Sequence, residues 1–125
     1  MIVGTGIDIA EVPRIQESIA RFGDRFLRRI YTEGEIRYCD SKANRAERYA
    51  ARFAAKEAGA KALGTGISRG VTWIEFQVAR QPGGRPVLEL RGRAALLARE
   101  LGVKTISLSL THTGNLAMAT VMMED

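Results

Sequence analysis

The sequence has one cysteine, one histidine and no long apolar run. The single Cys39 cannot form an internal disulfide and has no partner for a cysteine-based metal site. No segment approaches the roughly 18 apolar residues that a membrane-spanning helix needs, and the N-terminus lacks a basic leader with a cleavage pattern. We therefore expect a soluble, cytoplasmic protein in a reducing compartment, folded as a single domain over residues 1–125.

Several nucleotide-binding and catalytic signatures are also absent. There is no Walker motif, Rossmann glycine fingerprint, Ser/His/Asp pattern or Cys/His pattern, and the glycine-rich segment 64–66 follows a predicted helix rather than a strand. What the chain does have is positive charge, with 19 Lys and Arg against 14 Asp and Glu and a net charge of +5. Fifteen of the cations are arginines, which suit bidentate recognition of phosphates and carboxylates, so we expect an anionic partner or substrate.

The pattern of apolar residues, glycines and prolines predicts an α+β fold, in which a small, largely antiparallel sheet packs against a long helix and several shorter helices. Thr32 and Glu35 have the spacing of a capping box at the start of one helix. The expected strands are 2–9, 71–79, 86–90, 105–111 and 116–123. The expected helices are 13–22, 24–30, 32–40, 44–63 and 92–101.

Asp8 lies between two isoleucines of the first predicted strand. A carboxylate there costs solvation free energy unless something pairs with it. Gly4 and Gly6 share its side of the strand and would let a ligand or another backbone come close. The alternative is that Asp8 ends the strand and caps the next helix.

Glu57 follows Ala46, Ala50 and Phe53 on one row of the long predicted helix, so its carboxylate continues a face that looks buried. The alternative is an ordinary exposed ion pair with Lys61, four residues further on. A neighbouring row of the same helix is basic: Arg45, Arg48, Arg52 and Lys56. This row is either a solvated face or a phosphate clamp. Together, Asp8 and Glu57 would offer the oxygen ligands that suit Mg²⁺ or Mn²⁺ held jointly with phosphates.

His112 is the only histidine. Strand alternation places it on one face with Ile106, Leu108 and Leu110. A lone histidine on an apolar face is either a satisfied core residue or a functional group. The turn that follows, 113–115, could offer backbone N–H groups to an anion.

Three segments, in this order and spacing, resemble the holo-acyl-carrier-protein synthase family of small bacterial 4'-phosphopantetheinyl transferases. They are Gly6-Ile7-Asp8-Ile9, Arg52-Phe53-Ala54-Ala55-Lys56-Glu57-Ala58 with Lys61, and Ser109-Leu110-Thr111-His112. The similarity covers essentially the whole chain. It implies the fold of that family and Mg²⁺-dependent transfer of 4'-phosphopantetheine from coenzyme A to a serine of apo-acyl carrier protein, with release of adenosine 3',5'-bisphosphate, in support of fatty acid biosynthesis.

The resemblance also implies roles for individual residues. Asp8 and Glu57 would ligate a Mg²⁺ that holds the pyrophosphate of coenzyme A. Catalytic roles fall to Glu57, Lys61 and His112, and the identity of the general base stays open. Coenzyme A contacts are expected from Arg45, Arg52, Lys61, His112 and Thr113.

Two kinds of protein partner follow from the same resemblance. An acidic acyl carrier protein would dock on arginines of the first two helices, Arg14, Arg21, Arg25, Arg28 and Arg29, with Arg14 the best match to the carrier-binding arginine of the family. The chain is expected to form a homotrimer with active sites at subunit interfaces, and Asp8 and Glu57 could come from one subunit or two. Neither a membrane nor a nucleic acid is expected as a partner.

The alternative from another class is a non-catalytic basic module that binds nucleic acid, suggested by the excess of arginine. It fits less well, because aromatic residues make up only 6% of the chain and acids are mixed with the cations along every helix. Salt-dependent binding to nucleic acid, with none to coenzyme A, would favour this alternative.

Overall fold

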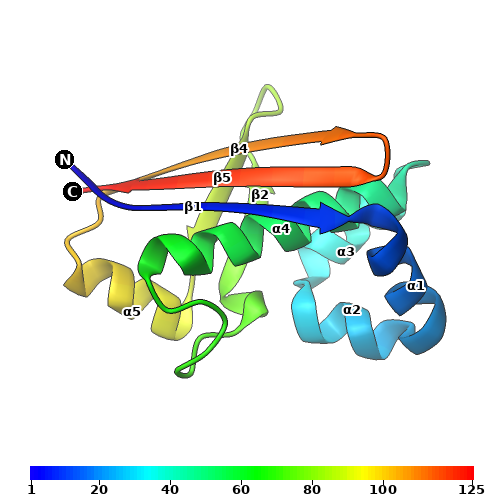
Figure 1. Ribbon diagram of the computed structural model, residues 1–125, viewed down its shortest axis with the longest axis horizontal. Helices are drawn as coiled ribbons and strands as arrows, with labels where there is room; N and C mark the ends of the chain where they lie inside the picture. The colour runs from blue at the N-terminus through cyan, green and yellow to red at the C-terminus, as the bar shows by residue number, and fades with distance from the viewer.

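Two antiparallel sheets and five helices build the computed structural model, which describes residues 1–125. The strands are β1 (Ile2–Glu11), β2 (Phe76–Arg80), β3 (Pro86–Leu90), β4 (Thr105–Thr113) and β5 (Leu116–Glu124). One sheet has the order β1-β5-β4, and the other is the hairpin β2-β3, which lies against β4. The helices all lie on one side of the three-stranded sheet (Figure 1). The predicted α+β class with an antiparallel sheet is therefore confirmed.

All five predicted helices are present. They are α1 (Val12–Phe22), α2 (Asp24–Ile30), α3 (Glu33–Asp40), α4 (Arg45–Leu63) and α5 (Gly92–Glu100). The predicted capping box forms at the start of α3, where the backbone N–H of Thr32 donates to Glu35 Oε1 at 2.8 Å. The expected strand 71–79 is wrong in its first half, because a second capping box, between Thr72 and Glu75, starts the short 3₁₀ helix η1 (Trp73–Glu75) there.

The glycines of β1 determine how closely α4 approaches the sheet. A Cβ atom on Gly6 would collide with the carbonyl of Ala58, and one on Gly4 would collide with the carbonyl of Ala62. The close approach expected at these glycines therefore involves the backbone of α4. Because side chains alternate along a strand, Asp8 lies on the same side of β1 and also faces α4.

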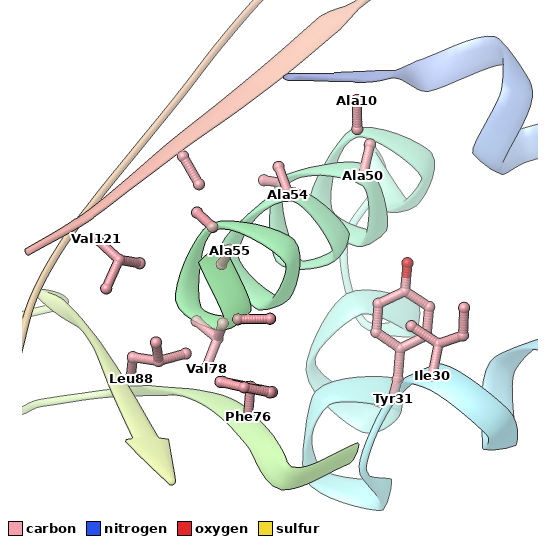
Figure 2. Packing of buried hydrophobic residues seen from close by; sticks show 14 of the residues in the cluster. Ala10, Ile30, Tyr31, Ala50, Ala54, Ala55, Phe76, Val78, Leu88 and Val121 are labelled. Atoms are coloured by element: carbon pink, nitrogen blue, oxygen red, sulfur yellow. The ribbon is translucent and has the colours of Figure 1, made fainter. Parts of the chain in front are cut away.

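Small side chains along α4 allow this packing to continue into the core. Ala50, Ala54 and Ala58 have no exposed surface, and Figure 2 shows alanines of α4 lying between β5 and the hairpin residues. On the hairpin side, Phe76 and Leu88 pack so closely on Gly59 that a Cβ there would lie 2.9 Å from each. The long helix is thus the centre of the hydrophobic core.

The opposite face of the three-stranded sheet is not covered by any helix (Figure 1). It carries exposed apolar side chains from two strands, Ile7 and Ile9 of β1 and Leu116 and Met122 of β5. None of the helices has the length and apolar character needed to cross a membrane.

Candidate functional site

Asp8 and Lys61 meet where β1 crosses α4. Lys61 Nζ donates to Asp8 Oδ1 at 3.1 Å and to the backbone carbonyl of the preceding residue at 2.9 Å. The Asp8 side chain is only 18% exposed, whereas that of Lys61 is 51% exposed. Asp8 does not cap a helix, because α1 starts at Val12 with Glu11 at its N-cap position. The capping alternative is therefore wrong. Asp8 is a residue of the strand itself, and its carboxylate pairs with Lys61.

Glu57 is half-buried on α4, one turn before Lys61. The expected alternative, an exposed ion pair between these two residues, does not form, because Lys61 is turned towards Asp8. Instead, Glu57 Oε1 accepts a hydrogen bond from the indole Nε1 of Trp73 at 3.1 Å. Within a single chain, Glu57 and Lys61 thus lie one turn apart on α4, and Lys61 contacts Asp8 on the adjacent β1. We call these three residues the β1 group.

His112 lies on the other outer strand, since β5 separates β1 from β4. Its Nδ1 is 3.2 Å from Oε2 of Glu47, in the first turn of α4, and both side chains are partly exposed. Thr113 follows at the exposed end of β4. Sequence reasoning did not find Glu47, because nothing in the pattern of α4 indicates which strand residue it meets. The structure therefore does not bring His112 together with the β1 group in one chain.

The basic row of α4 divides into residues with and without a carboxylate partner. Arg45 donates two hydrogen bonds to Asp40 Oδ1, at 3.1 and 2.9 Å, and the bond to Asp40 raises the pKa of Arg45. Lys56 is fully buried and donates to Glu35 Oε1 at 2.7 Å. Burial lowers the pKa of Lys56 against the opposing effect of Glu35. Lys56 is therefore neither part of a solvated face nor accessible to a phosphate.

Arg52, one turn earlier, is also buried, with 2% of its surface exposed. Its guanidinium lies over the ring of Tyr38, 4.5 Å from the centroid, and its Nε is the one buried side-chain polar atom without a hydrogen-bond partner. Three more cations lie over the same ring, Lys42 at 5.1 Å, Arg48 at 5.8 Å and Arg80 at 5.2 Å. None of these four cations forms an ion pair. This Tyr38 cluster is an uncompensated positive site that suits an anion with several oxygens.

The arginines of α1 and α2 are exposed as expected: Arg14, Arg21, Arg25, Arg28 and Arg29. Two grooves adjoin them. One, of about 340 Å³, is lined by residues that include Arg14, Ile15 and Phe53. The other, of about 310 Å³, is lined by Phe22, Arg25, Phe26 and Arg29. This surface combines positive charge with apolar hollows, which suits an acidic partner that also presents apolar side chains.

The two carboxylates of the β1 group are the metal-ligand candidates. No group of three or more His, Cys, Asp or Glu side chains could hold a metal ion. In Asp8 and in Glu57, only Oδ1 and Oε1 respectively accept hydrogen bonds from the protein, so each carboxylate keeps a second oxygen without a partner. Hard oxygen donors of this number fit Mg²⁺, which is commonly bound by one or two carboxylates together with substrate phosphates and water.

Comparisons with known proteins find matches to nearly the whole length of this chain. Residues 4–121 match the family described as the 4'-phosphopantetheinyl transferase superfamily. The holo-[acyl-carrier-protein] synthase of Koribacter versatilis is 62% identical over 125 residues, which is 100% of both chains. The crystal structure of the holo-[acyl-carrier-protein] synthase of Neisseria meningitidis is similar with a TM-score of 0.90 and 34% identity, covering 100% of both chains. That of Bacillus anthracis, in complex with CoA (3',5'-ADP), has a TM-score of 0.80 and 35% identity, covering 98% of this chain and 96% of the other.

Proposed function

Because this chain belongs to the 4'-phosphopantetheinyl transferase superfamily, we propose that it transfers 4'-phosphopantetheine from coenzyme A to a serine of an apo-acyl carrier protein, with residues 1–125 acting as one transferase domain. The serine oxygen forms a bond to the phosphorus that carries the pantetheine, the bridging phosphoanhydride bond breaks, and adenosine 3',5'-bisphosphate leaves. Supplying acyl carriers for fatty acid biosynthesis is the role that this reaction suits. The observation that carries the proposal is that α4 has two metal-ligand candidates beside it, its own Glu57 and Asp8 of the adjacent β1, and carries uncompensated cations in its earlier turns.

Asp8 and Glu57 would hold the Mg²⁺ through the oxygens that have no protein partner. When bound, Mg²⁺ would neutralise negative charge on the pyrophosphate and on the leaving group. Glu57, directly or through a water molecule, would take the proton that the serine hydroxyl loses. Lys61, with half of its side chain exposed, can turn from Asp8 to a phosphate oxygen when the substrate arrives.

His112 would contact a phosphate of coenzyme A through Nε2, because Nδ1 faces Glu47. The carboxylate of Glu47 would fix the orientation of the ring, with Nε2 directed towards the anion. Arg45, Arg52 and Thr113 are proposed to bind the remaining phosphate and ribose oxygens. Arg52 is the strongest candidate among them, because it belongs to the Tyr38 cluster and no carboxylate neutralises its charge.

The β1 group and the His112 side lie at opposite edges of the three-stranded sheet, and this separation supports a homotrimer with the active site at each subunit interface. Two different edges would meet across such an interface. A contact between unlike surfaces is heterologous, and repeating it closes a three-membered ring when the rotation between neighbours is a third of a turn. The uncovered sheet face, with Ile7 and Ile9 exposed, offers the apolar area for association. An Ile9→Glu substitution is expected to shift the protein from trimer to monomer in sedimentation analysis.

The arginines of α1 and α2 are proposed to dock the acidic carrier next to the β1 group, because the groove beside Arg14 also contains Phe53, one turn before Glu57 on α4. Exposed ion pairs contribute little affinity individually, so their main effect would be steering and orientation. Substituting Arg14→Glu should raise the KM for the carrier and leave the KM for coenzyme A unchanged.

The test is to incubate the protein with coenzyme A, Mg²⁺ and apo-acyl carrier protein and to follow the carrier by mass spectrometry. We expect the carrier to gain one phosphopantetheine, and we expect Asp8→Asn and Glu57→Gln to reduce the rate by at least about 100-fold while the circular dichroism spectrum stays unchanged. Absence of the adduct with several bacterial carriers would refute the proposal. A fully active Asp8→Asn protein would remove Asp8 from the metal site.

A further inference from the structure

Trp73, the only tryptophan in the chain, directs its one polar hydrogen at Glu57. We propose that Trp73 is a positioning residue that holds the Glu57 carboxylate in the orientation needed for metal binding, a role that rests on the proposed function. The indole N–H can donate a hydrogen bond but can neither ligate a cation nor accept a proton. Its bond to Oε1, 3.1 Å long, therefore fixes one oxygen of the carboxylate and leaves the other for the metal.

The indole is itself held from several sides, so it can impose an orientation on Glu57. Its ring stacks on Phe53 of α4, with 6.5 Å between ring centroids and 27° between the planes. The guanidinium of Arg29, on α2, lies 5.6 Å from the ring centroid. The backbone carbonyl of Trp73 accepts a hydrogen bond from Lys56 Nζ at 3.3 Å. The contacts with Phe53 and Lys56 tie Trp73 to the same helix that carries Glu57.

A carboxylate that is already oriented binds a metal more tightly than one that must be ordered first. A free glutamate side chain samples several rotamers, and ordering it opposes binding. Hydrogen-bond partners of metal ligands remove this cost, and losing one typically weakens metal affinity by 10- to 100-fold. The Glu57 side chain is only half-buried, so packing alone leaves it room to move, and the bond from Trp73 is its one hydrogen bond to the protein.

The Trp73→Phe variant separates the hydrogen bond from the packing, because phenylalanine keeps a ring for Phe53 and Arg29 but has no N–H. We expect the half-saturating Mg²⁺ concentration for transfer to rise about 10-fold, with a smaller change in kcat at saturating Mg²⁺. The dissociation constant for Mn²⁺, measured by calorimetry with coenzyme A present, should rise by a similar factor. The midpoint of thermal unfolding should change little.

Tyr31→Phe is the matched control. It also removes a donor from an aromatic side chain, because Tyr31 Oη donates to the carbonyl of Tyr49 at 2.8 Å, but that bond has no connection to Glu57. We expect this variant to lose stability and to keep the wild-type Mn²⁺ dissociation constant.

The fluorescence of the single tryptophan gives a readout that does not depend on turnover. Addition of Mn²⁺ with coenzyme A should quench Trp73 emission in the wild-type protein, and the Glu57→Ala protein should need at least about 10-fold more Mn²⁺ for the same quenching. The inference is overturned if Trp73→Phe binds Mn²⁺ within two-fold of wild type, or if quenching in Glu57→Ala is unchanged. A wild-type protein that binds Mn²⁺ but transfers nothing would refute the proposed function instead, so the two failures are distinguishable.

Discussion

Lys56 and Arg52 are one turn apart on α4 and are both buried, with 0% and 2% of their surfaces exposed, but their surroundings differ. Lys56 contacts the carboxylate of Glu35 and two backbone carbonyls. Arg52 contacts the face of an aromatic ring, lies among other cations, and leaves its Nε without an acceptor. Removing a buried cation leaves its buried carboxylate partner unpaired, whereas removing a buried cation that has no such partner leaves no carboxylate unpaired. We propose that the second kind of cation is kept for an anion that binds from outside.

The largest effect should follow from removing Lys56. The Lys56→Met substitution leaves the Glu35 carboxylate buried without its cation, so the free energy of unfolding should fall by about 3–5 kcal/mol. Denaturant unfolding measures this. The matched Arg52→Met variant should change it by less than about 1 kcal/mol, because no carboxylate loses a partner. Equal losses in the two variants would contradict the distinction between them.

A substitution of Tyr38 tests the surroundings of Arg52, since the ring of Tyr38 faces Arg52 and three other cations. Each such contact contributes about 0.5–1 kcal/mol when partly exposed. Tyr38→Leu should therefore lower the free energy of unfolding by about 2–4 kcal/mol, whereas Tyr38→Phe, which keeps the ring, should lose less than half of that. If both variants lose the same amount, the hydroxyl, which accepts a hydrogen bond from Arg48, is responsible instead of the ring.

The buried thiol of Cys39 makes the free energy of unfolding depend on pH. Burial raises the pKa of Cys39 from 9.0 to about 12, and Arg52 opposes this. As the pH rises, the unfolded chain loses the thiol proton before the folded protein does. The contribution of Cys39 to the free energy of unfolding is therefore fully present below pH 9 and is lost as the pH rises towards 12. Unfolding measured between pH 9 and pH 10 should show a loss of about 1 kcal/mol. The Cys39→Ala protein should lack this part of the slope; an identical slope would assign it to other groups.

The smallest effect is expected for Arg45, which has a carboxylate partner but is exposed. Solvent screens the ion pair with Asp40, so Arg45→Ala should change the free energy of unfolding by less than about 0.5 kcal/mol. The same denaturation experiment checks this. A loss as large as that of Lys56→Met would show that burial does not separate the two ion pairs.

Local sequence signals predicted most of the fold. The ends of the helices are determined by residues close to them in the chain: prolines, glycines and the capping box of Thr32 and Glu35. The sequence therefore predicts all five helices. The start of β2 differs from the prediction, because Thr72 and Glu75 repeat the same Thr-x-x-Glu spacing and start a 3₁₀ helix where a strand is predicted.

The candidate site was predicted in part, because its residues stand out in sequence but their partners do not. Asp8 stands out as a carboxylate between two isoleucines of a strand, and Glu57 as one that continues an apolar row of a helix. Helical periodicity places Arg52 and Lys56 on one strip and cannot separate them, because Glu35, the partner that distinguishes Lys56, is 21 residues away in the chain. The bond from Trp73 to Glu57 likewise depends on how η1 packs on α4, which no local pattern specifies.

Coenzyme A binding to the Arg52→Met protein is the most direct measurement of the central claim, that the uncompensated cations of α4 are held for the phosphates of the substrate. Calorimetry should show a dissociation constant at least about 10-fold above wild type, as expected for the loss of a charge-assisted hydrogen bond, while the free energy of unfolding stays within about 1 kcal/mol of wild type. An unchanged affinity for coenzyme A, together with a stability loss as large as that of Lys56→Met, would contradict the claim and make Arg52 a residue of the fold.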